Sequence, residues 1–104
     1  MASARLEMLL NLAAQDPGNL LVRYGLAMEL AGAGDLEGAV REHQAVRAQD
    51  PDYAASYYHG GQALEKLGRL EEAREVYRRG IEATTRTGNL HTRSELQAVL
   101  DLLG

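Results

Sequence analysis

Three histidines are the residues of this 104-residue sequence best suited to metal binding or to acid–base chemistry near neutral pH. His43, His59 and His91 fall in three different predicted helices, and no two of them are three or four positions apart. A metal site on one helix needs that spacing, because residues i and i+3 or i+4 share a helix face. The sequence therefore predicts no metal site, and His59 and His91 are expected on the surface or in a groove.

The other side chains that could catalyse a reaction lack suitable neighbours. The acidic pairs Glu71-Glu72 and Asp35/Glu37 stand at the start of predicted helices, where negative charge stabilises the helix dipole. None of the serines has a histidine and an acid at a spacing that indicates a nucleophile. The sequence has no cysteine, which excludes thiolate nucleophiles, and it has no glycine-rich phosphate loop. We expect neither enzyme activity nor a cofactor.

Composition narrows the choice of partner and compartment. The 11 basic and 15 acidic residues give a formal net charge of -4, whereas a surface that binds nucleic acid needs an excess of basic side chains. The hydrophobic content of 45% and charged content of 25% are typical of a folded domain. The apolar segment 6–12 is interrupted by Glu7 and Asn11 and is too short to cross a bilayer. We expect a cytoplasmic protein that binds neither nucleic acid nor membrane.

The elements that must position these residues repeat every 34 positions. The dipeptide Asp-Pro at 16–17 recurs at 50–51, and Gly34 recurs as Gly68. Between these breaks apolar residues return at helical spacing, and Asn19, Asp35 and Asp52 stand where an N-cap oxygen is needed. Helices are predicted over residues 4–15, 19–32, 35–48, 53–66, 69–84 and 89–103.

These units resemble the tetratricopeptide repeat, a 34-residue pair of antiparallel helices with the pattern W-x2-L-G-x2-Y…A-x3-F…P. The sequence Gly-x-Leu-Glu-x-Ala at 34–39 and again at 68–73 is the most specific part of the match. The resemblance implies an all-α fold, a TPR-like helical-hairpin solenoid of about six antiparallel helices, with His43 packed at an aromatic position. The matching positions are Arg23, Leu26, Ala27, Leu30, Ala39, His43 and Pro51 in the first unit and Tyr57, Gly60, Gly61, Leu64, Ala73, Tyr77 and Thr85 in the second.

Residues 1–104 are interpreted as a single domain. The sequence at 88–90 echoes that at 18–20 two positions later than the period requires, so a two-residue insertion is predicted within Thr84–Thr87. The last helix would turn Leu96, Val99 and Leu100 to the core, while its polar face ends the stack in water. The expected units are an N-terminal half-repeat helix at 4–17, repeats at 20–53 and 54–87, and a C-terminal capping helix at 88–104.

A stripe beside the core on the first helix of each unit is the candidate binding surface. Leu21, Tyr24 and Met28 share one face of the helix at 19–32, and Tyr58 and Gln62 repeat two of these positions 34 residues later. In solenoids of helical pairs the first helices line the concave surface, and tyrosine and methionine offer adaptable apolar area. The same residues could instead pack between neighbouring helices. The expected peptide-binding groove comprises Leu21, Tyr24, Met28, Tyr58, His59, Gln62 and Glu65.

The resemblance therefore implies a protein–protein interaction module that holds a peptide or helix of another protein in this groove. At most one residue matches the carboxylate clamp with which some tetratricopeptide domains bind a chain terminus. The alternative is a structural homo-oligomer that self-associates through the apolar first helix, and the expected state is a monomer or weak homodimer. RNA binding is a third reading, which the acidic net charge disfavours. The apolar residues of the first helix, too widely spread to face one neighbour, are Leu6, Met8, Leu9, Leu10 and Leu12.

Overall fold

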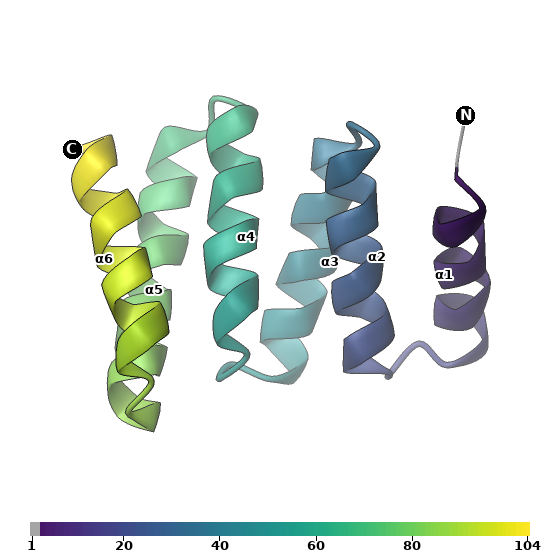
Figure 1. Cartoon of the computed structure of the whole chain (residues 1–104), viewed down its shortest axis with the longest axis horizontal. Coiled ribbons are helices and arrows are strands. Elements are labelled where there is room, and N and C mark those ends of the chain that lie inside the picture. Colours follow the sequence, from purple (N-terminus) through teal and green to yellow (C-terminus); the bar gives the residue numbers. More distant parts are fainter. Residues whose placement is uncertain (1–2) are drawn as a thin grey trace.

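The computed structural model describes residues 3–104, and within them the chain forms six α-helices. Each helix packs mainly against the next one in the chain, and α4 also contacts α2 and α6. Figure 1 shows these helices as a row of antiparallel neighbours, with α2, α4 and α6 nearer the viewer than α3 and α5. This arrangement confirms the predicted all-α helical-hairpin fold. The helices are α1 (Ala4–Gln15), α2 (Leu20–Gly32), α3 (Leu36–Gln49), α4 (Ala54–Lys66), α5 (Leu70–Thr87) and α6 (Leu90–Leu103).

Side-chain caps and left-handed glycines set most of the helix ends. Asn19 accepts a hydrogen bond from the Val22 amide at the start of α2, and Asp35 does the same for Gly38 in α3. Gly34 ends the turn after α2 with a φ of 89°, a conformation that favours glycine. The prediction for Asp52 was wrong, because α4 starts after Tyr53 with no side-chain cap. Asp52 instead lies on the surface and pairs with Arg86 at 2.5 Å.

The repeated loops are held by equivalent contacts from different side chains. Tyr57 donates its hydroxyl to the carbonyl oxygen of Pro51 at 2.6 Å. The residue 34 positions earlier is Arg23, whose Nε donates to the carbonyl oxygen of Pro17 at 2.7 Å. Arg23 also pairs with Glu42 at 2.7 Å. The arginine therefore replaces the aromatic residue of the repeat pattern and still fixes the loop that precedes its helix.

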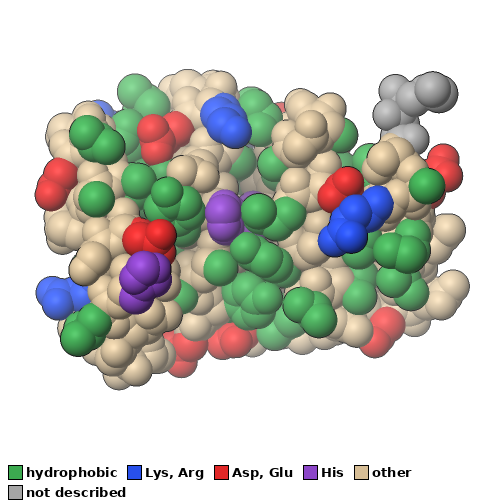
Figure 2. Space-filling view, viewed as in Figure 1, with side chains coloured by type: hydrophobic (Ala, Val, Ile, Leu, Met, Phe, Trp, Pro, Cys, Tyr) green, Lys and Arg blue, Asp and Glu red, His purple; other side chains and the backbone are tan. Residues whose placement is uncertain are grey.

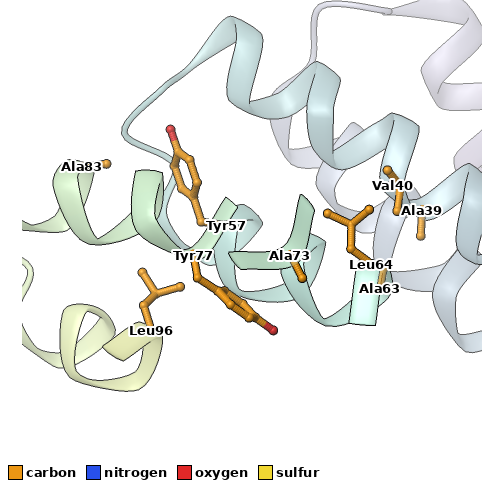
Figure 3. Close-up of a cluster of buried hydrophobic side chains, with 9 residues drawn as sticks. All are labelled: Ala39, Val40, Tyr57, Ala63, Leu64, Ala73, Tyr77, Ala83 and Leu96. Carbon is orange, nitrogen blue, oxygen red and sulfur yellow. The ribbon is translucent and has the colours of Figure 1, made fainter. Parts of the chain in front are cut away.

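The core consists of two clusters of buried side chains between the helices, and the partly buried Leu30 packs against both. Leu26 and Leu9 pack together at the α1 end, and Tyr77 and Leu96 lie fully buried at the α6 end. Figure 3 shows Leu96 of α6 beside Tyr77, with Leu64 farther along the same cluster. Val99 and Leu100 pack against this core as predicted. Each hairpin therefore covers the apolar face of its neighbour.

The second hairpin ends differently from the first. Helix α5 has 18 residues, whereas the equivalent helix α3 has 14. The loop after α5 is shorter than the loop after α3, so the net result is that α6 starts two positions later than the period requires. The predicted end at residue 84 was therefore too early. The hydroxyls of Thr84, Thr85 and Thr87 bond back to carbonyl oxygens one turn earlier, and Gly88 then ends the helix with a φ of 73°. Within residues 3–104 no helix combines the length and the apolar character that crossing a membrane requires.

Candidate functional site

The expected groove residues lie on the face formed by α2 and α4. Leu21, Tyr24 and Met28 line a hollow of about 500 Å³ between α1 and α2, together with Leu9 and Arg5 of α1. Leu21 is 74% exposed and Met28 is 37% exposed, so both offer apolar surface to a partner. Figure 2 shows hydrophobic side chains gathered over α2 and α4 on this face, with charged side chains beside them over α1 and α2.

A second hollow of about 220 Å³ lies between α2 and α4, beside the first. Met28 lines both hollows, so the two are neighbours on this face. His59 and Gln62 of α4 form one wall of the second hollow, and Lys66 stands at its exposed edge. Of the predicted groove residues, five therefore line one or both of these neighbouring hollows. They are Leu21, Tyr24, Met28, His59 and Gln62.

An aromatic cluster forms the floor between the two hollows. The ring of Tyr24 lies 5.2 Å from that of Tyr53, 5.8 Å from that of His43 and 6.2 Å from that of His59, measured between centroids. Tyr53 and His43 belong to this cluster although sequence reasoning did not place them there. Tyr53 stands in the loop before α4 and His43 on α3, so no helical periodicity connects them with Tyr24. Tyr24 is half-buried, and burial together with the neighbouring Tyr53 raises its pKa.

His43 is the buried polar residue of this cluster. Its Nδ1 lies 2.8 Å from the Ser56 hydroxyl oxygen, and that hydroxyl donates to the His43 carbonyl oxygen at 3.2 Å. Because the serine proton is used on the carbonyl, we infer that Nδ1 carries the imidazole proton and that Nε2 is an acceptor. Nε2 is buried and has no hydrogen-bond partner among residues 3–104. Burial, then the charges of Arg47 and His59, lower the pKa of His43 to about 3, so the ring is neutral.

The two remaining predicted groove residues lie outside both hollows. Tyr58 contacts His59 edge-on at 5.2 Å and packs against the hydrophobic core. Glu65 is half-buried and accepts a hydrogen bond from the Tyr77 hydroxyl, so part of its carboxylate is engaged with α5. Burial and this bond to Glu65 raise the pKa of Tyr77. Tyr58 therefore supports the aromatic floor, and Glu65 fixes α4 to α5.

Charged and titratable groups lie beside the groove. Arg5 of α1 pairs with Glu29 of α2 at 3.2 Å across the first hollow. His59 is half-buried and its pKa is lowered by burial, against which the charge of Glu95 acts. Within residues 3–104 no three His, Asp or Glu side chains are grouped closely enough to hold a metal ion. The described surface thus offers apolar and aromatic contacts with a few hydrogen-bonding groups.

Known proteins match both the sequence and the structure. The sequence profile of the tetratricopeptide repeat matches residues 30–92. A TPR repeat-containing protein of Pseudomonas aeruginosa is 32% identical over 82 residues, which are 79% of this chain and 78% of that protein. The crystal structure of a tetratricopeptide repeat domain protein from Salinibacter ruber has a TM-score of 0.76 at 32% identity, over 82% of this chain and 94% of that chain. The solution structure of a Bordetella parapertussis protein has a TM-score of 0.83 at 28% identity, over 97% of this chain and 88% of that chain.

These matches agree with the packing of the small residues at the repeat positions. Ala27 and Ala39 of the first hairpin are fully buried, and so is Ala73 of the second. Small side chains at these positions let the two helices of each hairpin approach closely. Repeats of this kind generally act as non-catalytic modules for protein–protein interaction. From its sequence profile, its relatives and its stacked helical hairpins, this chain belongs to the tetratricopeptide repeat family.

Proposed function

We propose that this protein binds another protein by holding a peptide segment or a helix in the groove across α2 and α4. The observation that carries the proposal is that the two neighbouring hollows share Met28 and that Tyr24 of the first contacts His43 and His59 of the second in the aromatic floor. The exposed apolar surface of Leu21 and Met28 would be covered by the partner. The partner is another protein, and neither nucleic acid nor membrane is part of the proposal. The protein is taken as a cytoplasmic, non-catalytic scaffold that uses no cofactor.

The proposal treats residues 1–104 as a single domain. The repeats at 20–53 and 54–87 would carry the groove, between the half-repeat helix at 4–17 and the capping helix at 88–104. Tyr24 and Met28 come from the first repeat and His59 and Gln62 from the second. A bound segment would therefore cross both repeats, which is how stacked hairpins create an extended binding surface.

The double variant Tyr24→Ala with Tyr58→Ala tests the groove. Proteins captured from native extract by the unmodified chain would be identified, and the affinity of one purified partner would be measured by calorimetry. The double variant should lose that binding, because it removes Tyr24, an aromatic anchor of the kind that commonly contributes about 2 kcal/mol or more, and Tyr58, which supports His59 from outside the hollows. Circular dichroism must show that the variant is still helical, because Tyr58 also packs against the core.

Self-association through α1 is the second candidate, and exposed apolar side chains favour it. Met8 is 51% exposed, Leu10 46% and Leu12 39%, while Leu6 and Leu9 of the same helix are buried against α2. The double variant Met8→Ala with Leu12→Ala removes two of these three exposed side chains and changes no residue that lines the groove. If that variant lost the partner and the tyrosine variant kept it, the groove proposal would be wrong. Light scattering separates a monomer from a weak homodimer.

A further inference from the structure

A third hollow lies on the opposite side of the molecule, between α3 and α5, the two helices that are farther from the viewer in Figure 1. Its volume is about 480 Å³. Leu64 and Val76 provide apolar walls, while Arg47 of α3 and Arg79 of α5 provide positive charge. Glu72 and Glu75 also line it. This hollow shares no lining residue with the proposed peptide groove.

Arg47 is half-buried in this hollow without a carboxylate to balance it. No carboxylate in residues 3–104 lies within ion-pair distance of its guanidinium. One of its nitrogens, Nη1, donates to the Ser56 carbonyl oxygen at 3.1 Å, and its Cζ lies 5.5 Å from the centroid of the Tyr57 ring. Burial lowers the pKa of Arg47, which is the sign of a cation removed from water. Most of its hydrogen-bond donors remain without a protein acceptor.

The two glutamates of the hollow are already engaged with other arginines. Both oxygens of Glu72 accept hydrogen bonds from Arg69, at 2.5 Å and 2.8 Å. Glu75 accepts from Arg79 at 3.2 Å and lies 3.9 Å from Arg78. Neither carboxylate therefore neutralises Arg47. An acid that enters from outside would meet a guanidinium whose charge is uncompensated.

The position of Arg47 is fixed by the backbone of α4. A β-carbon at Gly60 would lie 2.5 Å from Nη1 of Arg47, closer than any real contact of this kind. Gly60 stands where the tetratricopeptide pattern has a leucine, so the guanidinium occupies space that a leucine would fill. The arginine is held at the wall of the hollow by its hydrogen bond to the Ser56 carbonyl and by its contact with the Tyr57 ring. A pre-positioned guanidinium loses little entropy when it forms a bidentate bond to a carboxylate.

We propose that the hollow between α3 and α5 binds a carboxylate carried on an apolar stem, with Arg47 as its ligand, while Arg79 balances the charge of Glu75 in the same hollow. The apolar stem would lie against Leu64 and Val76. The carboxylate belongs to a partner protein, as an acidic side chain or as a chain terminus. The site is separate from the peptide groove and would act alongside it.

Nuclear magnetic resonance on the full chain can test the site directly. The probes are hexanoate and its neutral analogue hexanamide, and the signal is the Nε–Hε cross-peak of Arg47. Hexanoate should shift this peak saturably, whereas hexanamide should not. Two short apolar peptides, one with a free carboxyl terminus and one with an internal glutamate and an amidated end, would distinguish the two protein sources.

Matched arginine variants on α5 make the test specific. Arg79→Gln should weaken hexanoate binding severalfold, whereas Arg78→Gln should leave it unchanged, because Arg78 lies outside the hollow. Both variants keep Arg47, so the test does not depend on a change that disturbs the α3–α4 contact. The groove variant Tyr24→Ala with Tyr58→Ala should bind hexanoate normally. An Arg47 peak that does not move, an equal response to hexanamide, or equal losses in the two arginine variants would overturn the proposal.

Discussion

At the scale of single residues, the most unusual position is the buried site occupied by Leu9, His43 and Tyr77 in successive units. These residues are 34 positions apart, and all three are buried between helices. Leucine needs no polar partner, and Tyr77 places its hydroxyl on Glu65. His43 satisfies Nδ1 with Ser56 but leaves Nε2 without a partner. A buried polar atom without a partner costs about 1–3 kcal/mol, so Nε2 of His43 lowers the stability of the fold.

Stability should therefore fall as the pH falls below the ordinary histidine range. The folded pKa of His43 is about 3 and its unfolded value is 6.5, so the unfolded chain takes up the proton first. Above pH 6.5 this residue does not lower the free energy of unfolding through protonation. Between pH 6.5 and 3 the free energy of unfolding falls by about 1.4 kcal/mol per pH unit. Urea melts at pH 8 and pH 5 should differ by about 2 kcal/mol from this residue alone. The lowered pKa of His59 acts in the same direction.

Two substitutions separate this effect from the titration of other groups. His43→Phe removes the titrating ring and restores an aromatic side chain, so the difference between pH 8 and pH 5 should shrink markedly. His59→Gln removes the half-buried histidine whose pKa is also lowered by burial, and it should shrink the difference by less than His43→Phe does. An unchanged pH dependence in the His43→Phe variant would mean that the buried histidine is not the titrating group.

At the scale of helices, glycines decide how closely neighbours approach. A β-carbon at Gly61 of α4 would lie 2.2 Å from Cε1 of the fully buried Tyr77 on α5. A β-carbon at Gly25 of α2 would lie 3.5 Å from Leu9 on α1, which is an ordinary contact. The two glycines stand inside helices, where glycine costs about 1 kcal/mol relative to alanine. Of these two glycines, Gly61 is therefore the one that packing requires.

We predict that alanine has opposite effects at these two glycines. Gly25→Ala should raise the free energy of unfolding by about 0.5–1 kcal/mol, because it adds helix propensity without a clash. Gly61→Ala should lower it by about 1–3 kcal/mol, since the buried Tyr77 ring must shift. Urea melts of both variants measure this difference. A stabilised Gly61→Ala protein would show that α4 and α5 can separate without cost.

At the scale of the whole molecule, the sequence predicts the order of the helices because the 34-residue period and the glycine breaks are local signals. It also predicts which face of α6 is buried, since Leu96, Val99 and Leu100 follow helical spacing. It does not predict the end of α5. A threonine such as Thr84 suggests a loop in the sequence, but in the structure its hydroxyl donates to a carbonyl oxygen within the helix. The net insertion of two residues combines a longer helix with a shorter loop.

The candidate groove is only partly readable from sequence for a related reason. Tyr24 and Met28 share a helix face, which periodicity reveals, but Tyr53 and His43 join them only through contacts between different elements. The separation of Glu65 from the groove depends on its bond to Tyr77, which no spacing rule predicts. Arg47 shows the same limit, because its contacts with Ser56 and Tyr57 join α3 to α4 and no spacing rule predicts them.

The stack should fold as one unit, so removal of its last helix should destabilise the whole chain. Leu96 of α6 is fully buried, and its Cδ1 lies 2.8 Å from the position of a β-carbon on Gly80 of α5. Deletion of residues 88–104 would expose the face of α5 around Gly80 and Tyr77 to water. It would also remove the carbonyl of Gly104, to which Arg74 donates at 3.0 Å.

We therefore predict that the chain without residues 88–104 melts many degrees lower or aggregates. Leu96→Ala should reproduce part of this loss, at about 2–5 kcal/mol, because it leaves a cavity where the helix meets α5. Leu102→Ala provides the matched control, since Leu102 is 87% exposed and should be neutral to within about 0.5 kcal/mol. Thermal melts followed by circular dichroism, with light scattering for aggregation, measure all three proteins. A truncated protein that stayed monomeric with the melting temperature of the full chain would show that α6 contributes nothing to the stack.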